Sequence, residues 1–323
     1  MFKYCEKFNQ NINYNPKNGG WNTEKVTNMS NMFFGCKNFN QEIGGWNTQN
    51  VINMSNMFFD CKNFNQDIGW NTKNVTDMNR MFTNCEKFNQ NIGGWNTEIV
   101  TNMSYMFSGC KYFNENIGAW NTKNVTNMSS MFSGCSSFNQ NIGGWNTELV
   151  TDMSYMFSSC SSFNQDVGGW NTEKVTNMNK MFSGCKLFNQ NINYNPKNGA
   201  WNTKNVTNMS DMFNNCISFN QDIGGWNTEN VTNMGWMFYD CKNFNQDISA
   251  WKIKNGTNMN AMFKNSGVSK DIQHALIEKA NGNNINGGKR KRFLFTNSQK
   301  KKPIRFHCKS KRRKREPKLR FLS

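Results

Sequence analysis

The apolar positions of this chain recur every 25 residues over most of its length. Tryptophan marks the spacing most clearly, and a cysteine follows each tryptophan but the last at a constant offset. The tryptophans of the series are Trp21, Trp46, Trp70, Trp95, Trp120, Trp145, Trp170, Trp201, Trp226 and Trp251. A period of 20 to 50 residues indicates one structural unit stacked on copies of itself. The pattern therefore predicts a solenoid.

Two shorter periodicities lie inside each repeat. In residues 113–117 a Phe and an Ile stand four apart with polar residues between them, which favours a short strand with one buried face. Farther along the repeat, Met103, Met106, Phe107 and Cys110 are spaced as one face of a short helix. A Gly-Gly step before most tryptophans permits a tight bend. Each coil is thus predicted to contain a strand, a turn, an extended segment and a short helix.

The fold class predicted from these repeats is an α/β solenoid of about ten coils. Residues 1–265 form the repeats, and the first coil begins in the middle of a unit. Residues 266–281 are predicted to contain a capping helix, with Ile272, Leu276 and Ile277 on its apolar face. Residues 282–323 are predicted to be a flexible linker and a disordered basic tail. The ten units start at Phe8, Phe39, Phe64, Phe88, Phe113, Phe138, Phe163, Phe188, Phe219 and Phe244.

Asparagine and cysteine occupy fixed positions in the repeat. Stacking would bring the same Asn of successive coils together, so that its amide could bond its equivalent or the neighbouring backbone. The cysteines, without CxxC pairs, are interpreted as a column of small buried side chains rather than disulfides or metal ligands.

The positive charge is concentrated in the tail. The chain carries a net charge of +17, but residues 289–323 hold 16 of its 38 Lys and Arg and one of its 21 acidic residues. This segment is predicted to contact nucleic acid or another anionic surface, and it also fits nuclear targeting. The candidate contacts are Lys289, Arg290, Lys291, Arg292, Lys311, Arg312, Arg313, Lys314 and Arg315.

The residue before each Met-Phe pair varies from coil to coil, which indicates a solvent-facing position. Tyr105, Tyr155 and Trp236 occupy it in three coils, and Tyr239 lies close by. Exposed aromatic residues on a repeat surface are candidates for binding a protein partner. We therefore predict a partner-binding stripe that includes these four residues.

No catalytic or cofactor-binding pattern recurs along the chain. Its two histidines, His274 and His307, lie outside the repeats, and no phosphate-binding Gly loop is present. We expect a non-catalytic protein without cofactor or metal. The first residues lack a secretory signal and no stretch is long enough to span a membrane, which favours an intracellular location over secretion. The N-terminal coil is a candidate edge for self-association.

Residues 163–185, FNQDVGGWNTEKVTNMNKMFSGC, resemble the repeat of the DUF285 group of bacterial surface proteins, often labelled BspA-like leucine-rich repeats. The resemblance covers about residues 1–265. It implies a right-handed solenoid of leucine-rich-repeat type and a role in adhesion or protein interaction, commonly at cell surfaces. The alternative is a nucleic-acid-associated protein that binds through its basic tail, with the solenoid as a spacer or oligomeriser.

Overall fold

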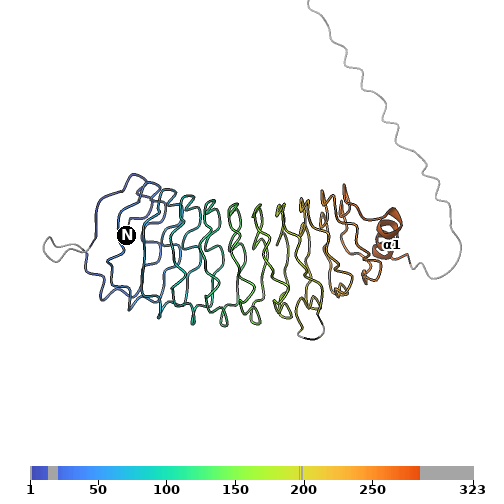
Figure 1. Ribbon diagram of the computed structural model, residues 1–323, viewed down its shortest axis with the longest axis horizontal. Helices are drawn as coiled ribbons and strands as arrows, with labels where there is room; N and C mark the ends of the chain where they lie inside the picture. Colours follow the sequence, from blue (N-terminus) through green and yellow to red (C-terminus); the bar gives the residue numbers. More distant parts are fainter. Residues whose placement is uncertain (1, 14–20, 196, 198, 284–323) are drawn as a thin grey trace, which may run out of the picture. The chain divides into compact units, whose positions relative to one another are not determined.

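The computed structural model describes residues 2–13, 21–195, 197 and 199–283. The chain divides into two compact units, residues 1–285 and 286–323, and the second lies outside the described residues. The first unit is a stack of similar coils that leads to one α-helix, α1, Lys270–Ala280 (Figure 1). The predicted solenoid is therefore present. Its right-handed sense stays a prediction.

Neighbouring coils meet through one row of parallel backbone bridges. Each coil contributes one Asn or Asp to this row, and each such residue bridges its equivalent in the next coil. Among the described residues the bridges remain isolated and no strand forms. The bridged residues are Asn28, Asn53, Asp77, Asn102, Asn127, Asp152, Asn177, Asn208, Asn233 and Asn258.

The predicted short helix in each coil is wrong. Residues 104–109 form successive turns, closed by bonds such as Met106 N–H to the Met103 carbonyl at 3.2 Å. Alternate N–H groups donate to the next coil instead, as Tyr105 does to the Ser129 carbonyl at 2.8 Å. Positive φ angles at Tyr105 (58°) and Gly109 (79°) exclude an α-helix here. Inter-coil bonding thus replaces intra-helical bonding.

The predicted strand at residues 113–117 is wrong as well, because side chains make the contacts between coils. The Asn114 N–H donates to Asn89 Oδ1 at 2.8 Å, and Asn114 Oδ1 in turn accepts the Asn139 N–H at 2.8 Å. The Gln140 amide donates to the Asn114 carbonyl at 2.8 Å. The expectation that stacked asparagines bond the neighbouring backbone is confirmed. The described coils therefore contain neither α-helices nor β-strands, so the predicted α/β composition of the solenoid is wrong.

The core consists of columns of identical side chains that run through the stack. Phe107 lies 4.1 Å from Phe113 between ring centroids within its coil, and 5.8 Å from Phe132 in the next. Trp120 and Trp145 are 6.4 Å apart and nearly parallel. The Trp145 indole N–H also donates to the Ile117 carbonyl at 3.2 Å. Burial of aromatic and aliphatic surface between coils is the main stabilising term.

The Gly-Gly step is needed for close approach rather than for an unusual backbone angle. A Cβ atom at Gly93 would lie 2.5 Å from the carbonyl oxygen of Asn116 in the next coil. The same conflict, at the same distance, exists at Gly118, Gly143 and Gly168. The first glycine therefore lets the coils approach one another.

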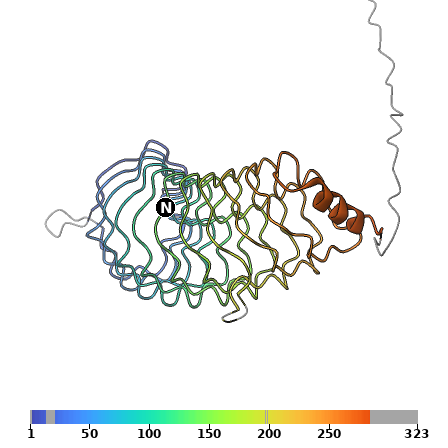
Figure 2. The same ribbon diagram turned by 45° about the vertical axis from the view of Figure 1, so that its right-hand side comes forward.

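Helix α1 lies beyond the last coil of the stack (Figure 2). Ser269 is its N-cap and accepts the Ile272 N–H through its side chain. Leu276 is fully buried in the core cluster and Ile272 packs against it, as the sequence predicts. Ile277 is 39% exposed, so its placement on the apolar face is wrong. Ala280 is buried instead, one helical turn beyond Leu276.

Candidate binding surface

One position per coil, at least partly exposed in nine of the ten described cases, has a left-handed backbone whatever residue occupies it. Its φ lies between +52° and +58° in all ten described cases. Such a conformation costs a non-glycine residue about 1–2 kcal/mol. We call these residues the display column: Asn31, Asn56, Arg80, Tyr105, Ser130, Tyr155, Lys180, Asp211, Trp236 and Ala261.

The flanking residues explain why the display column faces outward. In one coil Met103, Met106 and Phe107 are fully buried, while Tyr105 between them is only half-buried. The Tyr105 N–H is held by the Ser129 carbonyl of the next coil, as the equivalent N–H groups are. The buried residues around this position are therefore the same from coil to coil, while the residue at the position itself varies.

Tyr105 and Tyr155 lie in the display column but do not form one site. The Arg80 guanidinium lies 4.6 Å from the centroid of the Tyr105 ring, and the Lys180 ammonium lies 5.2 Å from that of Tyr155. Ser130, which is buried, separates the two tyrosines along the column. Each tyrosine is thus paired with a neighbouring cation.

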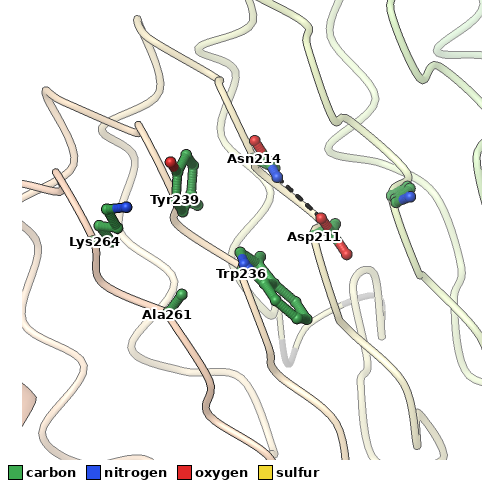
Figure 3. A pocket seen from close by; sticks show the side chains of 7 residues that line it. Asp211, Asn214, Trp236, Tyr239, Ala261 and Lys264 are labelled. Atoms are coloured by element: carbon green, nitrogen blue, oxygen red, sulfur yellow. Dashed lines mark hydrogen bonds between the residues drawn. The ribbon is translucent and has the colours of Figure 1, made fainter. Parts of the chain in front are cut away.

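Trp236 and Tyr239 line the same hollow, an open depression of about 590 Å³ (Figure 3). Asp211, Asn214, Ala261 and Lys264 surround them, and Lys180 completes the lining. Trp236 is 39% exposed. Small Ala261 follows it in the column, so no large side chain covers the indole from the next coil.

Polar groups of the hollow are held by their neighbours. The Asn214 amide donates to Asp211 Oδ1 at 2.9 Å, and the Lys264 ammonium lies 5.3 Å from the Tyr239 ring centroid. None of the ion pairs among the described residues includes Lys180, Asp211 or Lys264. The hollow therefore offers an aromatic surface with an acid and two ammonium groups around it.

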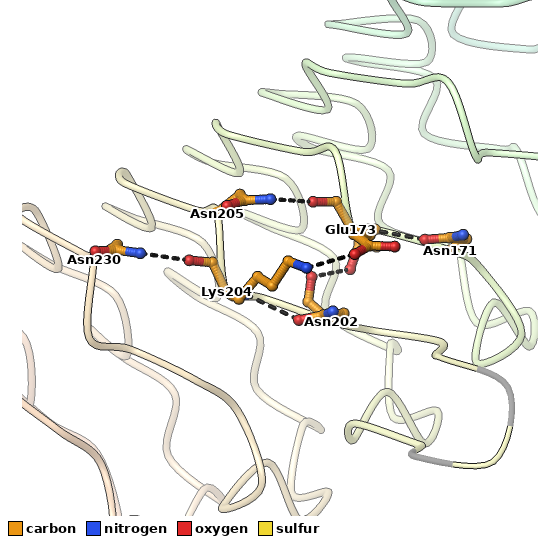
Figure 4. Close-up of polar contacts among 7 residues, drawn as sticks. Asn171, Glu173, Asn202, Lys204, Asn205 and Asn230 are labelled. Carbon is orange, nitrogen blue, oxygen red and sulfur yellow. Dashed lines mark hydrogen bonds and ion pairs between the residues drawn. The ribbon is translucent and has the colours of Figure 1, made fainter.

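Six ion pairs among the described residues join lysines to glutamates elsewhere on the stack. Lys204 Nζ lies 2.5 Å from Glu173 Oε1, and its hydrogen bond lowers the pKa of the Glu173 carboxyl (Figure 4). The Asn205 and Asn230 amides donate to the Glu173 and Lys204 carbonyls, each at 2.8 Å. Such contacts join neighbouring coils.

The cysteine column is buried, as the sequence predicts. Nine of its thiols are free and inaccessible, and Cys135 Sγ donates to the Phe107 carbonyl at 2.9 Å. Burial raises the pKa of the Cys36 thiol to about 11 and that of Cys241 to about 12. Buried, protonated thiols are poor nucleophiles. Within the described ranges no group of His, Cys, Asp and Glu could hold a metal ion.

The candidate tail contacts, residues 289–292 and 311–315, lie outside the described residues. In the part of the chain that the structure describes, no helix has the length and apolar character required to cross a bilayer.

Sequence reasoning missed several residues of the hollow. Asp211, Lys180 and Ala261 occupy the same variable position as Trp236, so the repeat alignment alone could have added them. Asn214 and Lys264 are the equivalents of Tyr239 in the coils on either side of it. Only the structure shows that these side chains from successive coils lie close enough to line one hollow.

A family model described as "Mycoplasma protein of unknown function, DUF285" matches residues 1–117, 101–198 and 195–284. No curated protein matches the chain. Among solved structures, a leucine-rich repeat protein from Eubacterium ventriosum is 12% identical, with a TM-score of 0.34; the match covers 80% of this chain and 65% of that one. The structure described as the TLR13–ssRNA13 complex is 9% identical, with a TM-score of 0.22, and covers 76% and 50%. The chain thus spans less than two thirds of each structure, and both TM-scores are too low to support an argument.

Proposed function

The chain belongs to the DUF285 family, and we propose that it is a non-catalytic repeat scaffold that binds a protein partner through the display column. The observation that carries the proposal is the contrast within each coil. Interior positions repeat the same residues, while the left-handed position between them carries an acid, a base, an amide or an aromatic ring. Repeat proteins that bind other proteins typically combine constant buried positions with variable positions on the binding surface.

The hollow around Trp236 is the proposed centre of this surface. Protein interfaces concentrate their binding energy in a few residues, with Trp, Tyr and Arg enriched among them. Trp236 and Tyr239 line one hollow, and Tyr105 and Tyr155 extend the surface along the column. Charged groups at the rim, Asp211 and Lys264 among them, would set the orientation of the partner.

Alanine substitutions test the role of the hollow. After a partner is captured with the full chain and identified, Trp236→Ala and Tyr239→Ala should each weaken its binding by about 2 kcal/mol, roughly thirtyfold. The melting temperature should stay unchanged, because both side chains lie at the surface. Calorimetric titration and thermal unfolding measure the two effects.

Tyr112→Ala is the matched control, since Tyr112 is 61% exposed and lies outside the display column. It should leave the affinity unchanged. Loss of stability in Trp236→Ala, or equal loss of affinity in Tyr112→Ala, would contradict the proposal.

A second candidate function rests on the distribution of charge. Residues 289–323 carry a net charge of +15, whereas residues 1–288 carry +2. Binding of nucleic acid or another anionic surface would then belong to the tail, with the solenoid as a spacer. Capture of partners by the full chain and by residues 1–281 distinguishes the two, because only tail-dependent partners are lost from the shorter chain.

The finer parts of the proposal are supported by the sequence alone. They are the division into residues 1–265, 266–281 and 282–323, adhesion at a cell surface, nuclear targeting and self-association through the N-terminal coil.

A further inference from the structure

In the part of the chain that the structure describes, the last coil has a row of backbone N–H donors without acceptors. In each of the nine preceding described coils, four alternate N–H groups donate to carbonyls of the next coil. For the ninth coil these bonds are Met234 to Asn258 (2.8 Å), Trp236 to Asn260 (2.9 Å), Phe238 to Met262 (2.9 Å) and Asp240 to Lys264 (2.9 Å). The equivalent N–H groups of Met259, Ala261, Phe263 and Asn265 have no acceptor among the described residues. We call residues 259–265 the open edge.

The open edge presents only hydrogen-bond donors, whereas the edge of an ordinary β-sheet presents both donors and acceptors. The carbonyls of Asn258, Asn260, Met262 and Lys264 are all used by the preceding coil, so the open side presents donors alone. An ordinary strand presents both N–H and C=O groups to its neighbour. It would place its own N–H groups against those of the edge. A matching partner must instead present successive carbonyls on one side.

The stack itself shows which backbone does this. Residues 208–214 offer the carbonyls of Asn208, Ser210, Met212 and Asn214 to the preceding coil, at 2.7–3.0 Å from the donors. Their shape depends on left-handed residues at Asp211 (57°) and Asn215 (59°). A segment of the N-M-S-x-M-F kind is therefore complementary to the open edge.

Side chains at the open edge are also incompletely covered. Met259 is only half-buried, although the equivalent methionines of the other described coils, such as Met234, are buried. Ala261 leaves a gap in the display column beside Trp236. Leu276 of α1 covers another part of the same end of the core. A segment with apolar residues at the positions of Met259 and Met262 would complete the burial of Met259.

We propose that the open edge binds an extended segment of a different protein that carries the N-M-S-x-M-F pattern, because within the stack of this chain the matching carbonyls, such as those of residues 208–214, already accept bonds from the preceding coil. The segment lies parallel to residues 259–265, in the place that a further coil would take. Its backbone carbonyls accept hydrogen bonds from the N–H groups of Met259, Ala261, Phe263 and Asn265. This site adjoins the hollow of the proposed function and shares Ala261 and Lys264 with it. It differs in using the backbone N–H groups on the C-terminal side of the last coil instead of the exposed aromatic side chains.

Amide hydrogen exchange of the full chain tests the proposal with the peptide TNMSDMFNN, residues 207–215, as the probe. At a peptide concentration ten times the dissociation constant, exchange at the four open-edge amides should slow about tenfold. The amides of Met103 and Tyr105, already bonded within the stack, should not change. Unchanged exchange at the open edge with saturating peptide overturns the proposal, as does equal protection by a peptide of the same composition in scrambled order.

Charge substitution at Ala261 tests the register. In the stack, Lys180 directly precedes Asp211 in the display column, and the column accommodates both residue types at positive φ. The Asp of the bound probe should therefore lie next to residue 261. Ala261→Lys should bind the probe about two- to fivefold more tightly and Ala261→Asp more weakly by a similar factor, as for a solvent-exposed ion pair.

With Asp211→Lys in the probe, the order of the two variants should reverse. The same order with both probes, or protection that appears at high protein concentration without peptide, overturns the proposal. The latter result would make a second copy of this chain the occupant of the edge.

Discussion

At the scale of the residue, two left-handed positions shape each coil. The first, the display column, accepts any residue type, including Trp236 and Ala261. The second lies four residues later and is mostly Gly, Asn or Asp, as at Gly109, Asn84 and Asp240. Small polar residues and glycine tolerate this conformation best. Ser159, with φ +64°, is the exception at the second position.

Ser159→Gly should therefore stabilise the chain by about 1 kcal/mol, because glycine pays no steric cost at positive φ. Its neighbour Ser158, which lacks a positive φ, is the matched control. Ser158→Gly should destabilise by about 0.5–1 kcal/mol through added freedom of the unfolded chain. Urea unfolding midpoints of the two variants measure this; a shift of the same sign in both would show that backbone strain at Ser159 is not the cause.

At the scale of the element, the rungs are built from turns and side-chain ladders instead of the predicted strand and helix. Met103, Met106 and Phe107 face inward, as their helical spacing implies. Consecutive turns with left-handed residues four positions apart, as at Tyr105 and Gly109, give the same spacing of inward-facing side chains, so periodicity alone could not distinguish these turns from a helix. The asparagine ladder was predictable because Asn recurs at the position of Asn114 in every coil, and stacking gives the amide at that position the same partner each time.

The cysteine column makes stability depend on pH. Burial raises the pKa of Cys135 above its ordinary value of 9.0, and the same holds for the thiols of Cys36 and Cys241. Above pH 9 the unfolded chain loses thiol protons that the folded chain retains. The stabilising contribution is thus complete below pH 9 and is lost as the pH rises toward 11 to 12.

The urea concentration at the unfolding midpoint should consequently decrease as the pH rises from 9 to 11. Cys135→Ala should make the slope of the unfolding free energy against pH shallower by the equivalent of about one proton. The variant should be less stable at pH 7, because a buried group is removed. Thiol titration supplies the second measurement: the nine buried thiols should react only after unfolding. An identical pH slope in Cys135→Ala would contradict the raised thiol pKa.

At the scale of the whole molecule, a nearly neutral stack of like coils adjoins a strongly basic segment in sequence. Coils inside the stack satisfy one another's backbone hydrogen bonds. Residues that distinguish one part of the chain from another are therefore found in the display column, at the ends of the stack and in the basic tail. Such a molecule can gain or lose a coil without altering the others, since each contacts only its neighbours.

The isolated peptide 282–323 should bind RNA or DNA with steep salt dependence, losing about 10³-fold in affinity between 50 and 200 mM salt if six or more phosphates are contacted. Residues 1–281 serve as the control and should not bind. Filter binding across a salt series measures both. Salt-independent binding by the peptide would rule out the electrostatic interpretation.

The sequence pattern alone was enough to predict the period, the stack, the buried columns of Trp, Phe and Cys, the helix near residues 270–280 and the outward position of Tyr105, Tyr155 and Trp236. Repetition made these inferences secure, because a residue that recurs in every coil must occupy the same environment in each. The backbone hydrogen bonds could not be predicted in this way, because they depend on how the coils pack. Each N–H can donate within its coil or to the next, and that competition depends on the distance between coils. The stacking also forms the hollow beside Ala261, and at the last described coil it leaves four N–H groups without an acceptor among the described residues.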